Sequence, residues 1–228
     1  KEAIKKKLTI SSENLRKINL FIEIYILINI QHYLINNFKK MNLNLKFFNK
    51  MPKQGKDNEI IFLNNEIIKI RYFKPLSKTV FSSKLFTQKN FLKKEYNNKN
   101  YIFVNCLNSK TSLDFEKQGS NLFTFLKENK IEEAVIDKNN NPLTTIQLEK
   151  ILHGLQLKSY DFDIYKTDKK KEILNINLDV VVRTQKTNLL RNKLKALLDG
   201  VFFARDLVSE PGNILHPDEY AKRITKLR

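Results

Sequence analysis

The stretch DGVFFARDLVSEPGNILHPDEYAKRI, residues 199–224, contains the end of one helix, a sharp stop and the start of a second helix. Apolar side chains in and before this stretch recur at three- and four-residue spacing. This spacing predicts one apolar stripe along a helix from about Leu189 to about Val208, which would pack against a core. The stripe consists of Leu190, Leu194, Leu197, Leu198, Val201, Phe202 and Val208.

Pro211 sets the end of this helix, because proline has no N–H to donate and forces the preceding residue out of the α region. The helix should therefore stop near residues 209–210. Gly212 and Asn213 tolerate positive φ best, so we expect the chain to turn there. Pro217, followed by two acidic residues, predicts the first turn of a second helix that continues to the end of the chain.

This order of residues resembles the segment that joins the two domains of the leucyl aminopeptidase (cytosol aminopeptidase) family. Members of that family carry a run close to A-R-D-L-V-N-E-P-x-N-x-x-T-P-x-x-x-A. Ser209 and His216 depart from the run, and the second helix should begin less firmly because His is a poorer N-cap than Thr. We expect Arg205 and Asp206 to make interface or capping contacts that fix the interdomain junction. The matching residues that we single out as structural are Arg205, Asp206, Glu210, Pro211, Asn213 and Pro217.

Length and composition indicate a globular protein, with 228 residues, 41% hydrophobic residues and 16 Phe. The formal net charge of +18 is typical of proteins that bind a polyanion such as nucleic acid. However, Lys, Asn and Ile are used throughout the chain, so we interpret the charge as spread over the whole surface rather than as a binding patch. Cys106 is the only cysteine, which excludes an internal disulfide and favours a reducing cytosol. We interpret it as a buried core residue rather than a reactive thiol.

Residues 1–40 are Lys-rich at first, then apolar from Ile18 to Ile30, then rich in Asn and Lys. Polar residues interrupt the apolar run, which makes a membrane span an unfavourable interpretation. A cleavable presequence would need a small-residue cleavage site after the run, and none is there. We favour a third interpretation, in which Met41 is the initiator and residues 1–40 are an extension. If they order, we expect one basic amphipathic helix.

Residues 41–186 have the pattern of an α/β domain. We expect strands at 41–48, 59–63, 66–72, 101–107, 131–136 and 173–182, a short helix at 75–87 and a polar turn at 93–100. Thr111 or Ser112 should cap one helix, and Thr144 or Thr145 another. The first of these helices joins the strands at 101–107 and 131–136 into a βαβ unit, which implies that these two strands form a parallel pair.

A second motif lies in residues 154–167 and resembles the family's G-x-x-L-x-x-Y-x-F-x-x-Y-K-T. The matching residues are Gly154, Leu157, Tyr160, Phe162, Tyr165, Lys166 and Thr167. The resemblance therefore covers roughly residues 41–228. It implies a mixed sheet flanked by helices, similar to the macro-domain class, in residues 41–186. Residues 187–228 would then be a long interdomain helix and the start of a catalytic domain.

The family has glycines after the first strand of the βαβ unit, where this chain has Asn105, Asn108 and Ser109. Their absence argues against a nucleotide or ADP-ribose site. His32, His153 and His216 are isolated, and for His153 a local hydrogen bond on its helix is favoured over a metal or catalytic role. Asp161, Asp163 and Asp168 are interpreted as a solvated face. We therefore assign no catalytic or metal-binding residue to this chain.

Leucyl aminopeptidases are exopeptidases that use two divalent ions and a bridging hydroxide. Their ligands lie in D-T-x-G-x-S-x-K and N-T-D-A-E-G-R motifs, downstream of the interdomain helix, and neither motif occurs here. The resemblance implies that the full-length enzyme is a cytoplasmic homohexamer acting on peptides with Mn or Zn, without a membrane partner. This chain should be inactive alone and hold no cofactor. The alternative function is a basic α/β module that binds nucleic acid, DNA in particular.

Overall fold

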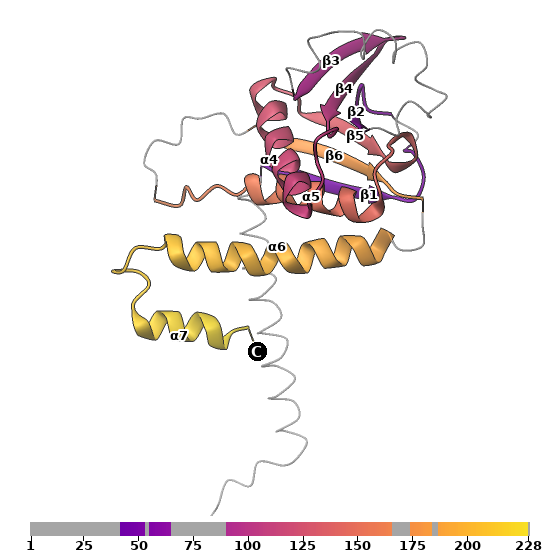
Figure 1. The fold of residues 1–228 in the computed structure, drawn as a ribbon. Helices are drawn as coiled ribbons and strands as arrows, with labels where there is room; N and C mark the ends of the chain where they lie inside the picture. Colours follow the sequence, from indigo (N-terminus) through magenta and orange to yellow (C-terminus); the bar gives the residue numbers. More distant parts are fainter. Residues whose placement is uncertain (1–41, 53–54, 65–89, 166–173, 184–186, 228) are drawn as a thin grey trace, which may run out of the picture. The chain divides into compact units, whose positions relative to one another are not determined.

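The computed structural model describes residues 42–52, 55–64, 90–165, 174–183 and 187–227 (Figure 1). These residues fall into two compact units, one ending at Asp206 and the other starting at Leu207. The expectations for residues 1–40, the strand at 66–72 and the helix at 75–87 lie outside the described residues.

A six-stranded mixed sheet forms the centre of the first unit, with the strand order β1-β6-β5-β2-β4-β3. Five strands run parallel and the edge strand β3 is antiparallel to β4. Together with the helices beside it, this sheet confirms the α/β class expected from the sequence. The strands are β1 (Leu43–Phe48), β2 (Asn58–Leu63), β3 (Phe91–Tyr96), β4 (Lys99–Asn105), β5 (Glu133–Asp137) and β6 (Ile176–Val181).

The polar turn predicted at residues 93–100 is much shorter in the structure, where only residues 97–98 form a turn and the rest of the segment belongs to the two strands of a β-hairpin. Strands β3 and β4 are joined by Asn97 and Asn98, which have φ of 50° and 59°. Positive φ at both central residues is what a two-residue hairpin turn of type I′ requires, and Asn is one of the few residues that tolerates it. The strand was missed because residues 93–96 are exposed on the sheet edge and therefore polar.

The expected βαβ unit exists, but its two strands do not form a pair. Helix α4 (Ser112–Glu128) connects β4 to β5, and β2 lies between these two parallel strands. The insertion of β2 could not be deduced locally, because β2 precedes the unit in sequence.

Two helices after the hairpin begin where the sequence indicates. Thr111 caps α4 and Thr144 caps α5 (Thr145–Lys158), each by accepting a hydrogen bond from the backbone N–H of the third helical residue. In both helices the third residue bonds back to the capping residue, which completes a capping box. These reciprocal bonds confirm the threonines as the helix starts.

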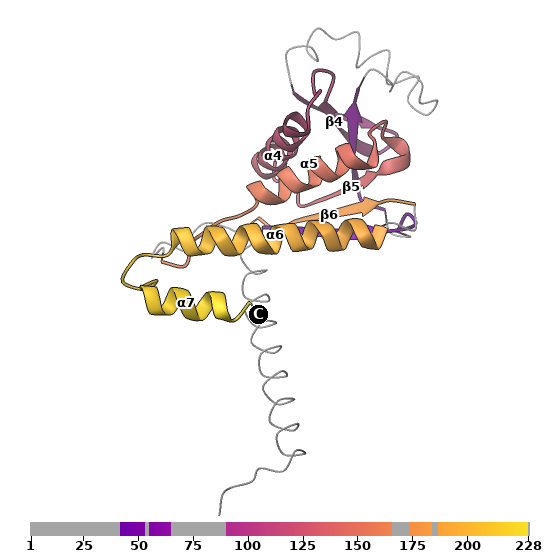
Figure 2. The same cartoon turned by 60° about the horizontal axis from the view of Figure 1, so that its bottom comes forward.

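One hydrophobic core is shared by a face of the sheet and by helices α4, α5 and α6 (Thr187–Ser209). Figures 1 and 2 both show α5 lying between α4 and α6. Strand β2 is buried on both of its faces, as is typical of a central parallel strand. The sheet therefore provides the rigid base on which the three helices are held.

The stripe on α6 is narrower than the sequence suggested. Its buried apolar residues are spaced four apart, whereas Leu197 is 45% and Val208 87% exposed. A spacing of four residues keeps side chains close to one line along a helix, so positions off that line face solvent. The buried line consists of Leu190, Leu194, Leu198 and Phe202.

Helices α4 and α5 cross in direct backbone contact through two glycines. A Cβ added at Gly119 would lie 1.9 Å from the carbonyl oxygen of Ile151, and one added at Gly154 would lie 2.0 Å from that of Glu116. No side chain fits at such distances. The close crossing therefore depends on glycine at both positions.

A charged cluster covers the same crossing. The Glu116 carboxylate accepts a hydrogen bond from Lys150 Nζ at 3.0 Å and lies 3.4 Å from His153 Nδ1. Burial alone would raise the pKa of Glu116, but the hydrogen bonds from Lys150 and His153 outweigh it and lower the pKa below its usual value. The local hydrogen bond expected for His153 is thus replaced by a contact across the two helices.

The second unit contains the end of α6, a turn and helix α7 (Pro217–Thr225). Helix α6 ends at Ser209, as the proline at position 211 predicts. His216 makes no side-chain capping bond, in agreement with the expected weak helix start. One expectation is wrong, because α7 ends at Thr225 instead of continuing. The expected turn at Gly212 and Asn213 is present, but neither residue has positive φ.

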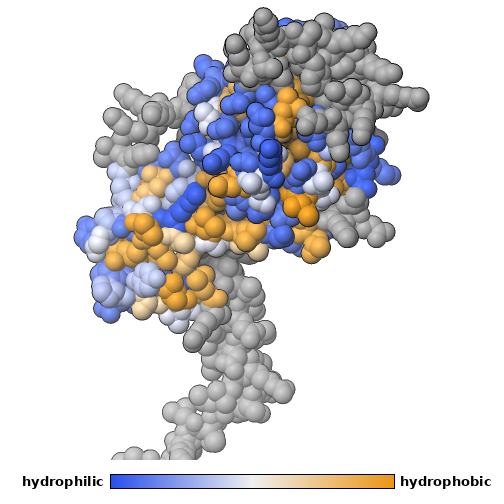
Figure 3. Space-filling model, viewed as in Figure 1, coloured by the Kyte–Doolittle hydropathy of each residue, from blue (hydrophilic) through white to orange (hydrophobic). Residues whose placement is uncertain are grey.

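The turn is built from right-handed backbone instead. The carbonyl oxygen of Pro211 accepts hydrogen bonds from the N–H groups of Ile214 and Leu215, so the chain turns without a left-handed residue. Hydrophobic surface gathers over α7 and the segment before it (Figure 3). Its exposed members are Val208, Ile214, Tyr220, Ile224 and Leu227. Among the described helices, none combines the length and hydropathy needed to cross a bilayer.

Candidate functional site

Arg205 joins α6 to the end of α5. Its Nη1 donates a hydrogen bond of 2.7 Å to the carbonyl oxygen of Leu157, in the last turn of α5. The last carbonyl groups of a helix have no partner within the helix and carry partial negative charge, so a guanidinium is well suited to this position. The same guanidinium lies 5.4 Å from the centre of the Tyr160 ring. Arg205 thus holds the segment that follows α5.

Asp206 holds the same segment from the next position of α6. Its Oδ1 accepts a hydrogen bond of 2.8 Å from the Tyr160 hydroxyl, and the residue is only 5% exposed. The Tyr160 ring also packs against Phe202, with ring centres 5.0 Å apart. Arg205 and Asp206 are adjacent, yet both contact Tyr160, because Arg205 lies over its ring and Asp206 accepts a hydrogen bond from its hydroxyl.

Tyr160 is therefore the residue on which the two sequence motifs meet. It matches the family pattern in residues 154–167 but is not one of the six residues that the sequence singles out as structural. The sequence signal that could have identified it is its type, since a tyrosine combines a large apolar ring with one hydroxyl that seeks a buried partner. Lys166 and Thr167, at the end of that pattern, lie outside the described residues.

The remaining motif residues lie in the second unit, at the turn between α6 and α7. Glu210 is paired with Arg223 of α7, whose Nη1 lies 3.2 Å from its Oε1, and Arg223 Nε also donates to Glu219 at 3.3 Å. The Glu210 side chain is 7% exposed. Pro211 accepts the two hydrogen bonds of the turn, Asn213 lies within it and Pro217 is the first residue of α7. Arg223 was missed because its partners depend on the angle of the turn.

The described residues do not fit a metal centre or a nucleophile. They contain no group of three or more His, Cys, Asp and Glu side chains arranged to hold an ion. Asp161 is exposed and Asp163 half-buried, while Asp168 lies outside the described range. Cys106 is buried, and burial raises the pKa of its thiol to about 12, so the nucleophilic thiolate is scarce at neutral pH.

The Tyr160 hydroxyl can be tested by replacing Tyr160 with Phe. We expect Tyr160→Phe to lower the free energy of unfolding by about 1–2 kcal/mol, because the buried Asp206 carboxylate loses a donor that water cannot fully replace. Urea unfolding followed by circular dichroism would measure the change. Tyr96→Phe is the matched control, since the 40% exposed Tyr96 should tolerate loss of its hydroxyl with little effect. Equal losses in both variants would contradict a specific role for the bond.

Three relatives with the name "Probable cytosol aminopeptidase" match the chain. The protein from Bradyrhizobium sp. is 36% identical over 92 residues, covering 39% of this chain and 18% of that protein. The one from Rhodopseudomonas palustris is 32% identical over 118 residues, covering 50% and 24%. The one from Phytoplasma mali is 38% identical over 90 residues, covering 37% and 18%. The chain thus spans less than a quarter of these relatives. No protein-family model matches it.

Two solved structures share the fold. A mutant of tomato leucine aminopeptidase aligns with a TM-score of 0.59 and 15% identity, covering 82% of this chain and 42% of that protein. The bottromycin maturation enzyme BotP in complex with Mn aligns with a TM-score of 0.53 and 16% identity, covering 75% and 36%. At this level of identity the structures show a common fold alone. Together with the sequence relatives they confirm the resemblance read from the motifs: this chain is related to the cytosol, or leucyl, aminopeptidases over a part of their length.

Proposed function

We infer that this chain is the N-terminal, non-catalytic portion of a two-metal leucyl aminopeptidase that removes N-terminal residues from peptides. The single observation that carries this inference is the contact between the two motif segments, in which Arg205 and Asp206 engage Leu157 and Tyr160. The matched relatives are named as cytosol aminopeptidases and extend well beyond the length of this chain. The contact supports a role in positioning, and the longer relatives support the place of this chain within a larger aminopeptidase.

The physical role we assign to the contact is to fix the direction in which α6 leaves the α/β unit. A 23-residue helix is a stiff connector, so its orientation is determined by the contacts that hold it. Apolar packing along the line of buried residues restrains the helix against the sheet. The Arg205 and Asp206 bonds add directional restraint close to the boundary at Leu207. A catalytic portion joined after this point would be held in a defined orientation.

In this proposal the two divalent ions, Mn or Zn, belong to the catalytic portion of a cytoplasmic hexamer. When bound there, they would supply an activated hydroxide for attack on the peptide bond. The described residues of this chain provide no donor set for such ions, so we assign no catalytic step to them.

A chimera tests the proposal. The chain would replace the matching part of the Phytoplasma mali relative, and we expect the chimera to hydrolyse leucine p-nitroanilide in the presence of Mn²⁺ and to assemble as a hexamer. The chain alone should show no hydrolysis with Mn²⁺ or Zn²⁺. Hydrolysis by the chain alone would overturn the proposal, as would a folded chimera that neither assembles nor cleaves substrate. A chimera with Arg205→Met and Asp206→Asn should be impaired, whereas one with Lys94→Met should not.

A further inference from the structure

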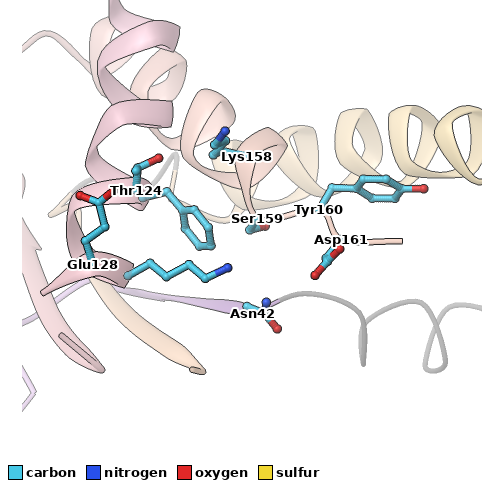
Figure 4. A pocket seen from close by; sticks show the side chains of 9 residues that line it. Asn42, Thr124, Glu128, Lys158, Ser159, Tyr160 and Asp161 are labelled. Carbon is cyan, nitrogen blue, oxygen red and sulfur yellow. The ribbon is translucent and has the colours of Figure 1, made fainter. Parts of the chain in front are cut away.

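A pocket of about 510 Å³ lies where helices α4 and α5 end, beside the start of β1 (Figure 4). Its size falls within the range of small-molecule sites. Phe123, which is buried in the core, and Tyr160 contribute aromatic surface to its lining. Figure 4 shows Thr124 and Glu128 on one side and Lys158, Ser159 and Asp161 on the other. The pocket thus has apolar surface with polar groups on facing walls.

The hydroxyl groups of the pocket are already engaged within the protein. Thr124 Oγ1 donates to the carbonyl oxygen of Ser120 at 3.3 Å, Ser159 Oγ donates to that of Gln156 at 2.7 Å, and the Tyr160 hydroxyl donates to Asp206. A ligand could not displace these bonds without a loss of stability. Recognition of a ligand therefore falls to the charged side chains.

Three charged ends remain available at the pocket. Within the part of the chain that the structure describes, no hydrogen bond or ion pair engages the charged groups of Lys127, Glu128 and Lys158. The lysines come from the last turns of two different helices, so a carboxylate could lie between them. Glu128 could accept the ammonium group of the same molecule.

The net charge of the lining selects the class of ligand. The lining contains two lysines, Lys127 and Lys158, and two carboxylates, Glu128 and Asp161, so its formal charge is zero although the chain carries a formal charge of +18. A phosphate or nucleotide would bring two or more negative charges to a wall that also carries two carboxylates, whose repulsion opposes binding. A zwitterion presents one charge of each sign and avoids this repulsion.

We propose that this pocket binds a free amino acid with an apolar side chain, its carboxylate between Lys127 and Lys158 and its ammonium group on Glu128. The ring of Phe123, which lines the pocket, accommodates the side chain. Because the charged groups are exposed, each ion pair contributes modestly and the dissociation constant should be on the order of 1 mM. This site does not depend on the proposed peptidase function.

The test is an NMR titration of the 228-residue chain, labelled with ¹⁵N, with L-valine as the probe. Two analogues separate the charges: valinamide lacks the carboxylate, and 3-methylbutanoate lacks the ammonium group. We expect L-valine to shift the amide signals of residues 127–128 and 158–161, and both analogues to bind several-fold more weakly. Adenosine monophosphate should not shift these signals. The absence of shifts up to about 20 mM L-valine, equal binding of the analogues, or tighter binding of the nucleotide would overturn the proposal.

A pair of lysine variants completes the test. Lys158→Met keeps an unbranched side chain of nearly the same length and removes its charge, and we expect it to raise the dissociation constant for L-valine about three- to tenfold. Lys94→Met, on the exposed edge strand β3, should leave the dissociation constant unchanged. Because Lys158 also complements the negative end of its helix, the readout is binding rather than stability. Equal affinity of the two variants would overturn the assignment of Lys158.

Discussion

Gly154→Ala is expected to destabilise the α/β unit by about 3 kcal/mol or more, or to prevent its folding. The added Cβ would lie 2.0 Å from the carbonyl oxygen of Glu116 and 2.6 Å from the carbonyl carbon, both backbone atoms of α4. A backbone atom cannot rotate away as a flexible side chain can. The helices would have to separate, which would open the contacts of Phe115, Leu122 and Ile151 in the core beneath them.

Gly200→Ala is the matched control for this experiment. Gly200 lies in α6, and a Cβ added there meets no atom within 4 Å. Alanine is a better helix former than glycine, so this variant should be more stable by about 0.5–1 kcal/mol. The two substitutions make the same chemical change but should shift the free energy of unfolding in opposite directions. Urea unfolding of both proteins measures the difference, and a Gly154→Ala protein as stable as the parent would disprove the close crossing.

The same contact gives a physical reason for the first residue of the second motif. From the sequence, Gly154 only matches one position of the family pattern, and the pattern does not indicate a structural role for it. The structure shows that it allows α5 to touch α4, and the end of α5 then presents Leu157 and Tyr160 to α6. The glycine and the tyrosine of the motif are thus linked through the placement of one helix.

Features governed by neighbouring residues could be predicted from the sequence. Thr111 and Thr144 begin helices because a capping hydroxyl needs only the next three residues, and Pro211 ends α6 by its own covalent structure. The hairpin at Asn97 and Asn98 was equally local, but the polar edge strand before it concealed the pattern.

Features that depend on residues distant in sequence could not be predicted. The position of β2 between β4 and β5, and the glycine contact between α4 and α5, follow from how complete elements pack. For the candidate site, Arg205 and Asp206 were expected to make contacts at the junction. Their partner Tyr160 lies 46 positions from Asp206, and nothing local to either residue indicates the pairing.

Asn141 illustrates such a distant interaction and carries the second large prediction. Strands β2 and β5 pair at Glu59 and Val135 alone, so further along β2 the backbone groups on the β5 side have no partner strand, although β4 pairs with the other side. The Asn141 side chain takes its place: Oδ1 accepts from the N–H of Phe62 at 2.7 Å, and Nδ2 donates to the carbonyl oxygen of Ile60 at 3.2 Å. Nδ2 also donates to the carbonyl oxygen of Asp137 at 2.7 Å. One amide thus connects two strands.

Asn141→Asp is expected to lower the free energy of unfolding by about 3 kcal/mol at neutral pH, because the residue is buried and two donated bonds become contacts between a carboxylate and carbonyl oxygens. These oxygens raise the pKa of the introduced carboxyl, which gains a proton, and with it one donor, as the pH falls. The difference in the free energy of unfolding between Asn141→Asp and the parent protein should therefore become smaller at acidic pH. Asn192→Asp, on the exposed side of α6, should change stability by less than about 0.5 kcal/mol. Urea unfolding at neutral and acidic pH measures both effects, and a deficit that widens in acid would show that Asn141 does not bridge the strands through its amide donors.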